Sequence, residues 1–245
     1  MAEGIIEQER RICIIIPCFN EAENIAQLIS SIRFYVPLAS IIVVDDNSPD
    51  GTADVVRGVM KKDACIDLVV REGKGGRGSA SIEGMKRALD EGADIIIEMD
   101  ADFSHNPAEL PLLIEALGEY DMVVGSRYLS SSRIKKWGIT RRIFSKIANL
   151  YARFMLGIPI TDYTNGYRAY KREVLEAVDF DRVVRAGYVV LSEVAMDIFS
   201  KGFKIGEIPT YFVNRQRGES NLSLDEILSA FTSILDLRRR YIGLL

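Results

Sequence analysis

The sequence predicts an α/β fold, an α/β/α sandwich whose mostly parallel central sheet carries helices on both faces. Three observations support this class. Short runs rich in Val and Ile alternate with segments of helical pattern. The runs lack a two-residue alternation of apolar and polar residues, as expected of strands buried on both faces. Polar clusters follow the runs, at the strand ends where such sheets bind ligands.

The first half of the chain follows a regular order of strand and helix, which is typical of right-handed βαβ units. The expected strands are residues 12–16, 41–45, 66–70, 95–99 and 122–124. The expected helices between them are residues 21–35, 52–62, 79–91 and 107–117.

After residue 124 this order breaks. We expect a polar, basic segment at 126–146, a helix ending near 156, a turn-rich piece at 157–167, helices near 171–178 and 189–201, a strand pair around 204–213 and a last helix over 222–241. The last helix has apolar residues on one face. Since no linker or repeat is visible, we expect one domain over 1–216 and an amphipathic helical appendage over 217–245.

The composition restricts location and partners. A net charge of −4 argues against nucleic acid as the main partner. Cys13, Cys18 and Cys65 lie in or beside apolar runs without a CxxC pattern, which favours a reducing, cytoplasmic location. The N-terminus shows no signal-peptide pattern, and no stretch approaches the roughly 20 apolar residues of a membrane span. We therefore expect any membrane contact to be peripheral.

Asp100 and Asp102 directly follow the expected strand 95–99. In an extended segment, residues i and i+2 point the same way, so both carboxylates can face one ligand. A hard cation such as Mg²⁺ or Mn²⁺ would neutralise them and bridge diphosphate oxygens. The alternative is a polar strand end that caps the next helix.

Two further strand ends carry ligand-binding patterns. Asp45 and Asp46 begin the string DDNSPDGT, in which Asp46 could contact a base or ribose, although a plain β–α turn capped by Thr52 has a similar composition. Residues 73–78 match G-x-G-x-x-G, which raises a dinucleotide-binding alternative. This match follows the third strand and would leave Asp102 unexplained, so we disfavour it.

The segment 133–146 is basic and contains no acid. Such cations bind phosphate and anionic membrane surfaces, and Trp137 is of the type that settles at a membrane interface. The alternative is a solvated basic helix face. His105, the one histidine, is expected to be polar surface and not an acid–base residue.

Taken together, these motifs resemble those of family-2 glycosyltransferases, especially the dolichyl-phosphate mannose synthases and related polyprenyl-phosphate sugar transferases. The resemblance runs from residue 12 to 222. It includes PCFNEAEN at 17–24, DDNSPDGT at 45–52, REGKGGRGSA at 71–80, MDADFSHNP at 99–107, GSRY at 125–128, TDYTNGYR at 161–168 and RQRGES at 215–220. Three places depart from the family pattern: Asn221 replaces a Lys, Asn165-Gly166 replaces a Gly-Ser pair, and Val190-Leu191-Ser192 stand where an aromatic-Gln pair is common.

The resemblance implies a GT-A fold and a set of site residues. The nucleotide would contact Pro17, Phe19, Glu21, Val44 and Asp46, with Lys74, Ala101 and Asn221 as further substrate-binding residues. Asp100, Asp102 and Ser104 would hold the metal and the sugar diphosphate. Arg127, Arg141, Ser145 and Arg215 would bind phosphates of acceptor and donor, and Arg127 and Arg215 would join the two aspartates as catalytic residues.

The implied reaction is inverting transfer of mannose from GDP-mannose to dolichyl or another polyprenyl phosphate, with Mg²⁺ or Mn²⁺. The enzyme would act peripherally at the cytosolic face of a membrane, with or without a membrane-anchoring partner subunit. Two alternatives stay open. One is a glucosyl- or N-acetylglucosaminyltransferase that uses a UDP-sugar, and the other is a non-catalytic nucleotide-sugar-binding subunit.

Overall fold

The computed structural model describes residues 10–183, 189–213 and 224–241. Its main sheet has seven strands in the order β3-β2-β1-β4-β7-β5-β8. All neighbouring pairs are parallel except those of β7, which runs antiparallel to both β4 and β5. The predicted α/β class with a mostly parallel sheet is therefore confirmed.

The elements follow the predicted order closely in the first half. The strands there are β1 (Ile12–Cys18), β2 (Ser40–Asp45), β3 (Ile66–Val70), β4 (Ile95–Glu98) and β5 (Met122–Ser126). The helices are α1 (Ile25–Tyr35), α2 (Thr52–Met60), α3 (Arg77–Asp90), the short 3₁₀ turn η1 (Pro107–Glu109) and α4 (Leu110–Ala116).

The second half contains α5 (Ile139–Leu156), α6 (Arg172–Ala177), α7 (Val189–Ser200) and α8 (Leu224–Tyr241). Its strands are β6 (Arg133–Lys135), β7 (Arg168–Lys171), β8 (Ile205–Pro209) and β9 (Tyr211–Val213). Helix α5 ends before Gly157, whose φ of 71° is the left-handed conformation that glycine supplies at helix ends.

Two features of this half differ from the sequence-based expectation. β7 was not predicted, because its four residues begin and end with a cation and show no apolar run. The two strands of 204–213 do exist, but they do not pair with each other. β8 joins β5 in the main sheet, whereas β9 pairs with β6 in a separate two-stranded sheet, which places the basic segment beside the end of β5.

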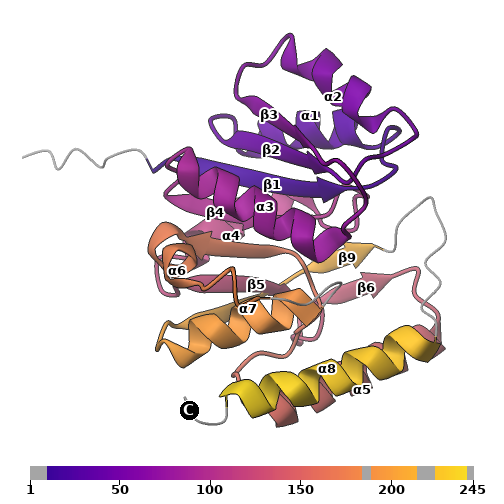
Figure 1. The fold of residues 1–245 in the computed structure, drawn as a ribbon, viewed down its shortest axis with the longest axis vertical. Helices are drawn as coiled ribbons and strands as arrows, with labels where there is room; N and C mark the ends of the chain where they lie inside the picture. Colours follow the sequence, from indigo (N-terminus) through magenta and orange to yellow (C-terminus); the bar gives the residue numbers. More distant parts are fainter. Residues whose placement is uncertain (1–9, 184–188, 214–223, 242–245) are drawn as a thin grey trace, which may run out of the picture.

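Helices cover both faces of the sheet (Figure 1). On one face, α1, α2 and α4 pack against a core that includes Ile14, Ile41 and Ile97. On the other face, side chains of α3, α5, α6, α7 and α8 share a core with Ile15 and Val44. Because the polar turns after β1, β2 and β4 leave the same edge of the sheet, this layering brings their side chains together.

Candidate active site

A pocket of about 220 Å³ opens at the carboxyl ends of β1, β2 and β4. Most of the side chains predicted to contact a nucleotide sugar line it: Pro17, Phe19, Glu21, Asp46, Lys74, Asp100, Ala101 and Asp102. Ser104 and Val44 do not line it. The side chain of Val44 is fully buried in the core instead, where Gly84 packs closely against it.

Asp46 anchors the glycine-rich loop that forms one wall of this pocket. Its Oδ1 accepts hydrogen bonds from Arg71 Nη1 at 2.6 Å and from the Gly75 backbone N–H at 2.9 Å. Its Oδ2 accepts from the Gly76 N–H at 2.7 Å. The loop thereby brings Lys74 to the pocket, with its ammonium 3.9 Å from the centre of the Phe19 ring. One aromatic face and one cation therefore meet where a nucleotide is expected.

The acidic pair lies in a tight turn after β4. The Ser104 N–H donates to Asp102 Oδ1 at 3.0 Å, and Phe103 between them has a left-handed φ of 59°. A bulky residue in this conformation is strained, so the surrounding contacts must hold it there. Asp102 and Ser104 are buried, whereas Asp100 is partly exposed toward the pocket.

His105 supports this turn from beneath and is not on the surface, contrary to expectation. It is fully buried and stacks on Tyr167, with ring centroids 4.8 Å apart. The Asp100 backbone N–H donates to His105 Nδ1 at 3.0 Å, so the ring proton is on Nε2, which lies 2.8 Å from Asn165 Oδ1. His105 thus links the acidic turn to residue 165.

The predicted metal ligands offer donor atoms that suit a hard divalent cation. Asp100, Asp102 and Ser104 offer carboxylate and hydroxyl oxygens, the ligand type that Mg²⁺ and Mn²⁺ prefer. The Ser104 hydroxyl oxygen is buried and has no hydrogen-bond partner among the described residues. Within the described ranges no group of three or more His, Cys, Asp or Glu side chains is placed to coordinate a metal ion. The residues therefore fit a cation that takes its remaining ligands from diphosphate and water.

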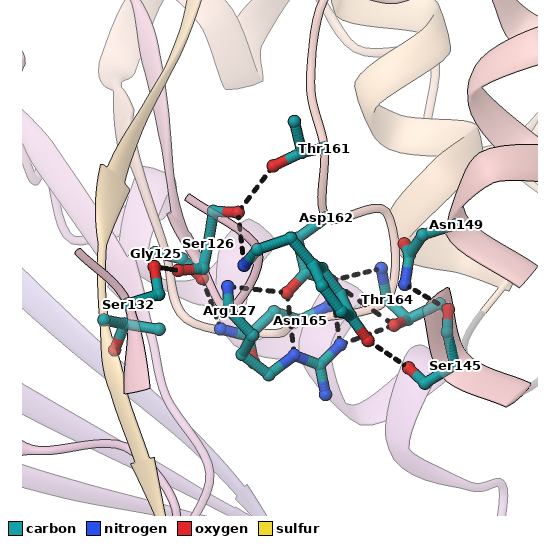
Figure 2. A network of polar contacts seen from close by, with 12 residues as sticks. Gly125, Ser126, Arg127, Ser132, Ser145, Asn149, Thr161, Asp162, Thr164 and Asn165 are labelled. Atoms are coloured by element: carbon teal, nitrogen blue, oxygen red, sulfur yellow. Dashed lines mark hydrogen bonds and ion pairs between the residues drawn. The ribbon is translucent and has the colours of Figure 1, made fainter. Parts of the chain in front are cut away.

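Arg127 directly follows β5 and is held by a buried ion pair with Asp162 (Figure 2). Its Nε and Nη2 donate to the two oxygens of Asp162 at 2.7 and 2.8 Å, and Nη2 also donates to Thr164 Oγ1. Burial alone would raise the pKa of the Asp162 carboxyl, but the Arg127 charge and several N–H donors outweigh it and lower that pKa. A phosphate at Arg127 would have to share the guanidinium with this pair.

Trp137 joins Arg127 to the first turn of α5. The guanidinium carbons of Arg127 and Arg141 lie 5.2 and 4.7 Å from the centre of its ring. Ser145, one turn beyond Arg141, accepts a hydrogen bond from the Tyr128 hydroxyl at 2.6 Å. The expected grouping of Arg127, Arg141 and Ser145 is thus present, with two cations around one indole. Trp137 packs within the protein and also contacts Phe212.

Some predicted residues cannot be placed, and one important residue was missed. Arg215 and Asn221 lie outside the described residues, so their phosphate and substrate contacts remain predictions. Arg77 lines the donor pocket and contacts Asp100, although nothing in the sequence interpretation assigned it a role. A cation at the first position of a helix was the available signal.

Comparisons with known proteins agree with this geometry. The model of the family described as glycosyl transferase family 2 matches residues 13–179. An undecaprenyl-phosphate mannosyltransferase from Micrococcus luteus is 39% identical over 213 residues, covering 87% of this chain and 88% of the relative. A polyprenol monophosphomannose synthase from Mycolicibacterium smegmatis is 36% identical over 233 residues, covering 94% and 88%.

Solved structures with the same fold include glucosyl-3-phosphoglycerate synthase from Mycobacterium tuberculosis. Its complex with phosphoglyceric acid has a TM-score of 0.68 at 23% identity, covering 96% of this chain and 81% of that one. Its complex with Mn²⁺, UDP and glucosyl-3-phosphoglycerate gives the same values. At this identity the likeness establishes the GT-A-like fold alone.

Proposed function

This chain belongs to glycosyltransferase family 2, and from that membership we propose that it transfers mannose from GDP-mannose to a polyprenyl phosphate with inversion at the sugar carbon. The observation that carries the proposal is an identity of 36–39%, over about nine-tenths of each chain, to two enzymes named for mannosyl transfer to polyprenyl phosphates. Support from the site comes from its division into an acidic donor pocket and a basic, aromatic cluster around Trp137.

The proposed reaction does not require a general base from the protein. A phosphate monoester has its second pKa near 6, so the acceptor is already an anionic nucleophile at neutral pH. The protein must instead bring two anions together and stabilise the departing diphosphate. Arg141 is suited to hold the acceptor phosphate, and Phe19 and Lys74 to hold the nucleotide. A divalent cation held by Asp100, Asp102 and Ser104 would neutralise charge on the leaving group.

Contact with the membrane is proposed to occur through α5. Its outward face carries five exposed apolar side chains at helical spacing: Ile139, Ile143, Ile147, Leu150 and Phe154, each between 53% and 78% exposed. Exposed cations such as Arg142 and Lys146 lie on the same helix. Such a face enters the headgroup region of an anionic bilayer, with the cations near the phosphates. No helix in the described ranges has the length and apolar composition needed to cross a bilayer.

This assignment leaves Trp137 and the apolar face of the last helix inside the protein. Trp137 packs between two arginines and Phe212. In α8, which lies beside α5 (Figure 1), Ile234, Leu237 and Tyr241 are buried in the core. Two arginines near the end of that helix contact other parts of the protein: Arg238 donates to the Met155 carbonyl and Arg240 pairs with Glu193, while Arg239 is exposed.

A donor and acceptor screen tests the proposal. Purified protein is incubated with a short polyprenyl phosphate, Mn²⁺ or Mg²⁺, and radiolabelled GDP-mannose, UDP-glucose or UDP-N-acetylglucosamine. We expect label in the lipid fraction only with GDP-mannose, and no transfer to the corresponding prenol, which lacks the anion. Transfer from a UDP-sugar would replace the mannose assignment. Donor binding without any transfer would favour a nucleotide-sugar-binding subunit that needs a partner.

A further inference from the structure

Arg77 is placed where a helix disfavours a positive charge. It is the first residue of α3, which has no acidic residue in its first turn. The free N–H groups at a helix N-terminus carry a partial positive charge, so a cation there is destabilising by a few tenths of a kcal/mol or more. A compensating interaction elsewhere must therefore hold this side chain in place.

The compensation comes from two carboxylates of the acidic turn and its strand. Arg77 Nε and Nη2 both reach Asp100 Oδ1, at 2.8 and 2.6 Å. Nη2 also lies 3.0 Å from Oε1 of Glu98, which is fully buried. Ser81, one turn along α3, donates to the same Glu98 oxygen at 2.6 Å. Both Arg77 contacts to Asp100 thus converge on Oδ1, which holds that oxygen at the guanidinium.

Gly166 provides the space for this guanidinium. A Cβ atom on Gly166 would lie 1.8 Å from Arg77 Nη2 and 2.7 Å from Cζ. These distances are far below van der Waals contact, so no larger residue fits here while Arg77 holds Asp100. The Asn165-Gly166 departure from the family pattern thereby acquires a physical reason. Asn165 contacts His105 beneath the acidic turn, and Gly166 makes room for the arginine above it.

We propose that Arg77 is a positioning residue for the metal site: through Asp100 it sets the affinity of the acidic pair for a divalent cation bound with a nucleoside diphosphate. The inference rests on the proposed function, which supplies the cation and the diphosphate. Carboxylates that bind metals are themselves oriented by hydrogen bonds, and loss of such an outer partner lowers metal affinity about 10- to 100-fold. Glu98 keeps the guanidinium in place, because a buried carboxylate without a cation is strongly disfavoured.

The decisive variant is Gly166→Ala, which displaces Arg77 from Asp100 without changing any charge. Binding of Mn²⁺ is measured by electron paramagnetic resonance, in the presence of GDP and separately of UDP, without sugar or acceptor. We expect affinity for Mn²⁺ to fall about 10- to 100-fold. The matched control is Gly58→Ala on α2, where an added Cβ meets no atom within 4 Å, and its Mn²⁺ binding should equal that of the wild type.

A second pair of variants separates positioning from folding. Replacing Arg77 and Glu98 together by methionine removes both buried charges, a change that folds commonly tolerate. This double variant should unfold at a temperature near that of the wild type, yet bind Mn²⁺ as weakly as Gly166→Ala. Glu98→Gln alone keeps an amide oxygen that can accept from Arg77 Nη2 in place of the carboxylate. The contact between Arg77 and Asp100 should then persist, and Mn²⁺ should bind within about twofold of the wild type.

The outcomes discriminate clearly. Folded Gly166→Ala and double variants that bind Mn²⁺ as tightly as the wild type, or more tightly, would overturn the role of Arg77. Weaker binding only in proportion to lost folded protein would reduce Arg77 to a structural residue and overturn it equally. If the wild type itself binds no Mn²⁺ with either nucleotide, the metal site of the proposed function fails instead, independently of any variant.

Discussion

The two sides of the site are built in different ways. On the donor side, Phe19, Asp46 and Asp100 each lie within a few residues of a strand end, so the parallel sheet alone brings them together. On the acceptor side, Arg127 and Trp137 meet Phe212, which is 75 or more residues away in sequence, through the pairing of β6 with β9. The donor pocket is thus a local property of the sheet, and the acceptor cluster is a product of tertiary packing.

This difference also appears in the charges. The donor pocket gathers several carboxylates and cations at its surface, with Asp46 paired to Arg71 and Asp100 to Arg77. In the acceptor cluster the ion pair of Arg127 with Asp162 is buried. We therefore expect changes on the donor side to reduce catalysis without unfolding the protein. Changes to the buried pair on the acceptor side should reduce stability as well.

The largest expected effect is that of Asp102→Ala, which should abolish transfer. Loss of one of two carboxylates removes several kcal/mol of charge stabilisation, or at least about a thousandfold in rate. Transfer of radiolabelled mannose measures the rate, and circular dichroism should show an unchanged fold. Asp90→Ala at the exposed end of α3 is the matched control. Near-normal turnover, or wild-type activity that resists a chelator, would contradict the assignment.

Asp162→Asn should destabilise the fold by about 3–5 kcal/mol, because it leaves the Arg127 charge buried without its partner. Since the pKa of Asp162 is lowered by folding, its contribution is fully present at pH 7. That contribution is lost as pH falls below the ordinary value of about 3.9 toward the folded-state pKa. Urea unfolding at pH 7 and in the acid range should therefore show a smaller acid-induced loss for the variant than for the wild type.

The matched change at an ion pair outside the site is Asp63→Asn. Asp63 pairs with Arg33 at 2.6 Å, but both side chains are partly exposed. Solvent screening should make its cost smaller than that of Asp162→Asn. An equal loss of unfolding free energy for the two substitutions would show that burial of the Arg127–Asp162 pair makes no difference to its contribution.

Arg141→Ala should lower kcat/KM for the polyprenyl phosphate about 10- to 100-fold, the usual value of a charge-assisted contact of roughly 1.5–3 kcal/mol. The KM for GDP-mannose should stay within about twofold of the wild type. Arg57→Ala on α2 removes an exposed arginine from the donor side and serves as the control. A fall in donor affinity with unchanged acceptor kinetics would show that Arg141 binds the donor and not the acceptor.

The last expected effect is on membrane attachment, where the exposed face of α5 enters only the headgroup region and its side chains are only partly buried. Ile143→Ser with Leu150→Ser removes two apolar groups from the exposed face of α5, and each buried side chain of this size is worth at most about 1.5–3 kcal/mol. Flotation with anionic liposomes should show weaker binding, with turnover on a detergent-dispersed acceptor retained. Phe34→Ser with Leu38→Ser is the control, since those side chains are at least as exposed but lie at the end of α1 and in the turn before β2.

If the variant with Ile143→Ser and Leu150→Ser is recovered with liposomes at the wild-type level, the α5 face is excluded as the attachment surface. High salt should weaken attachment of the wild type, because salt screens exposed charges beyond a Debye length of about 10 Å at 0.1 M. If the wild type stays in the soluble fraction at both low and high salt, a separate membrane-anchoring subunit becomes the better explanation.

The sequence predicted what depends on neighbouring residues and missed what depends on distant ones. The isoleucine- and valine-rich strands and the polar turns after them could be predicted, because each turn directly follows its strand in the sequence. Arg77 was invisible because its partners, Glu98 and Asp100, follow more than 20 residues later on another element. The apolar face of α5 was also overlooked, because its spacing resembles that of a buried helix until the structure shows which face is covered.

The insertion of β7 between β4 and β5 has a consequence for the order of assembly. The strand that precedes Asp100 is paired on one side by β1, but its other edge is closed only by residues 168–171. Until the ribosome has released that segment, β4 is an edge strand with open N–H and C=O groups, a liability for misassembly. A nascent chain that already contains the donor-pocket motifs up to Asp102 therefore still has β4 as an unpaired edge. The main sheet is complete only when β7, a strand with no apolar run of its own, pairs with β4 and β5.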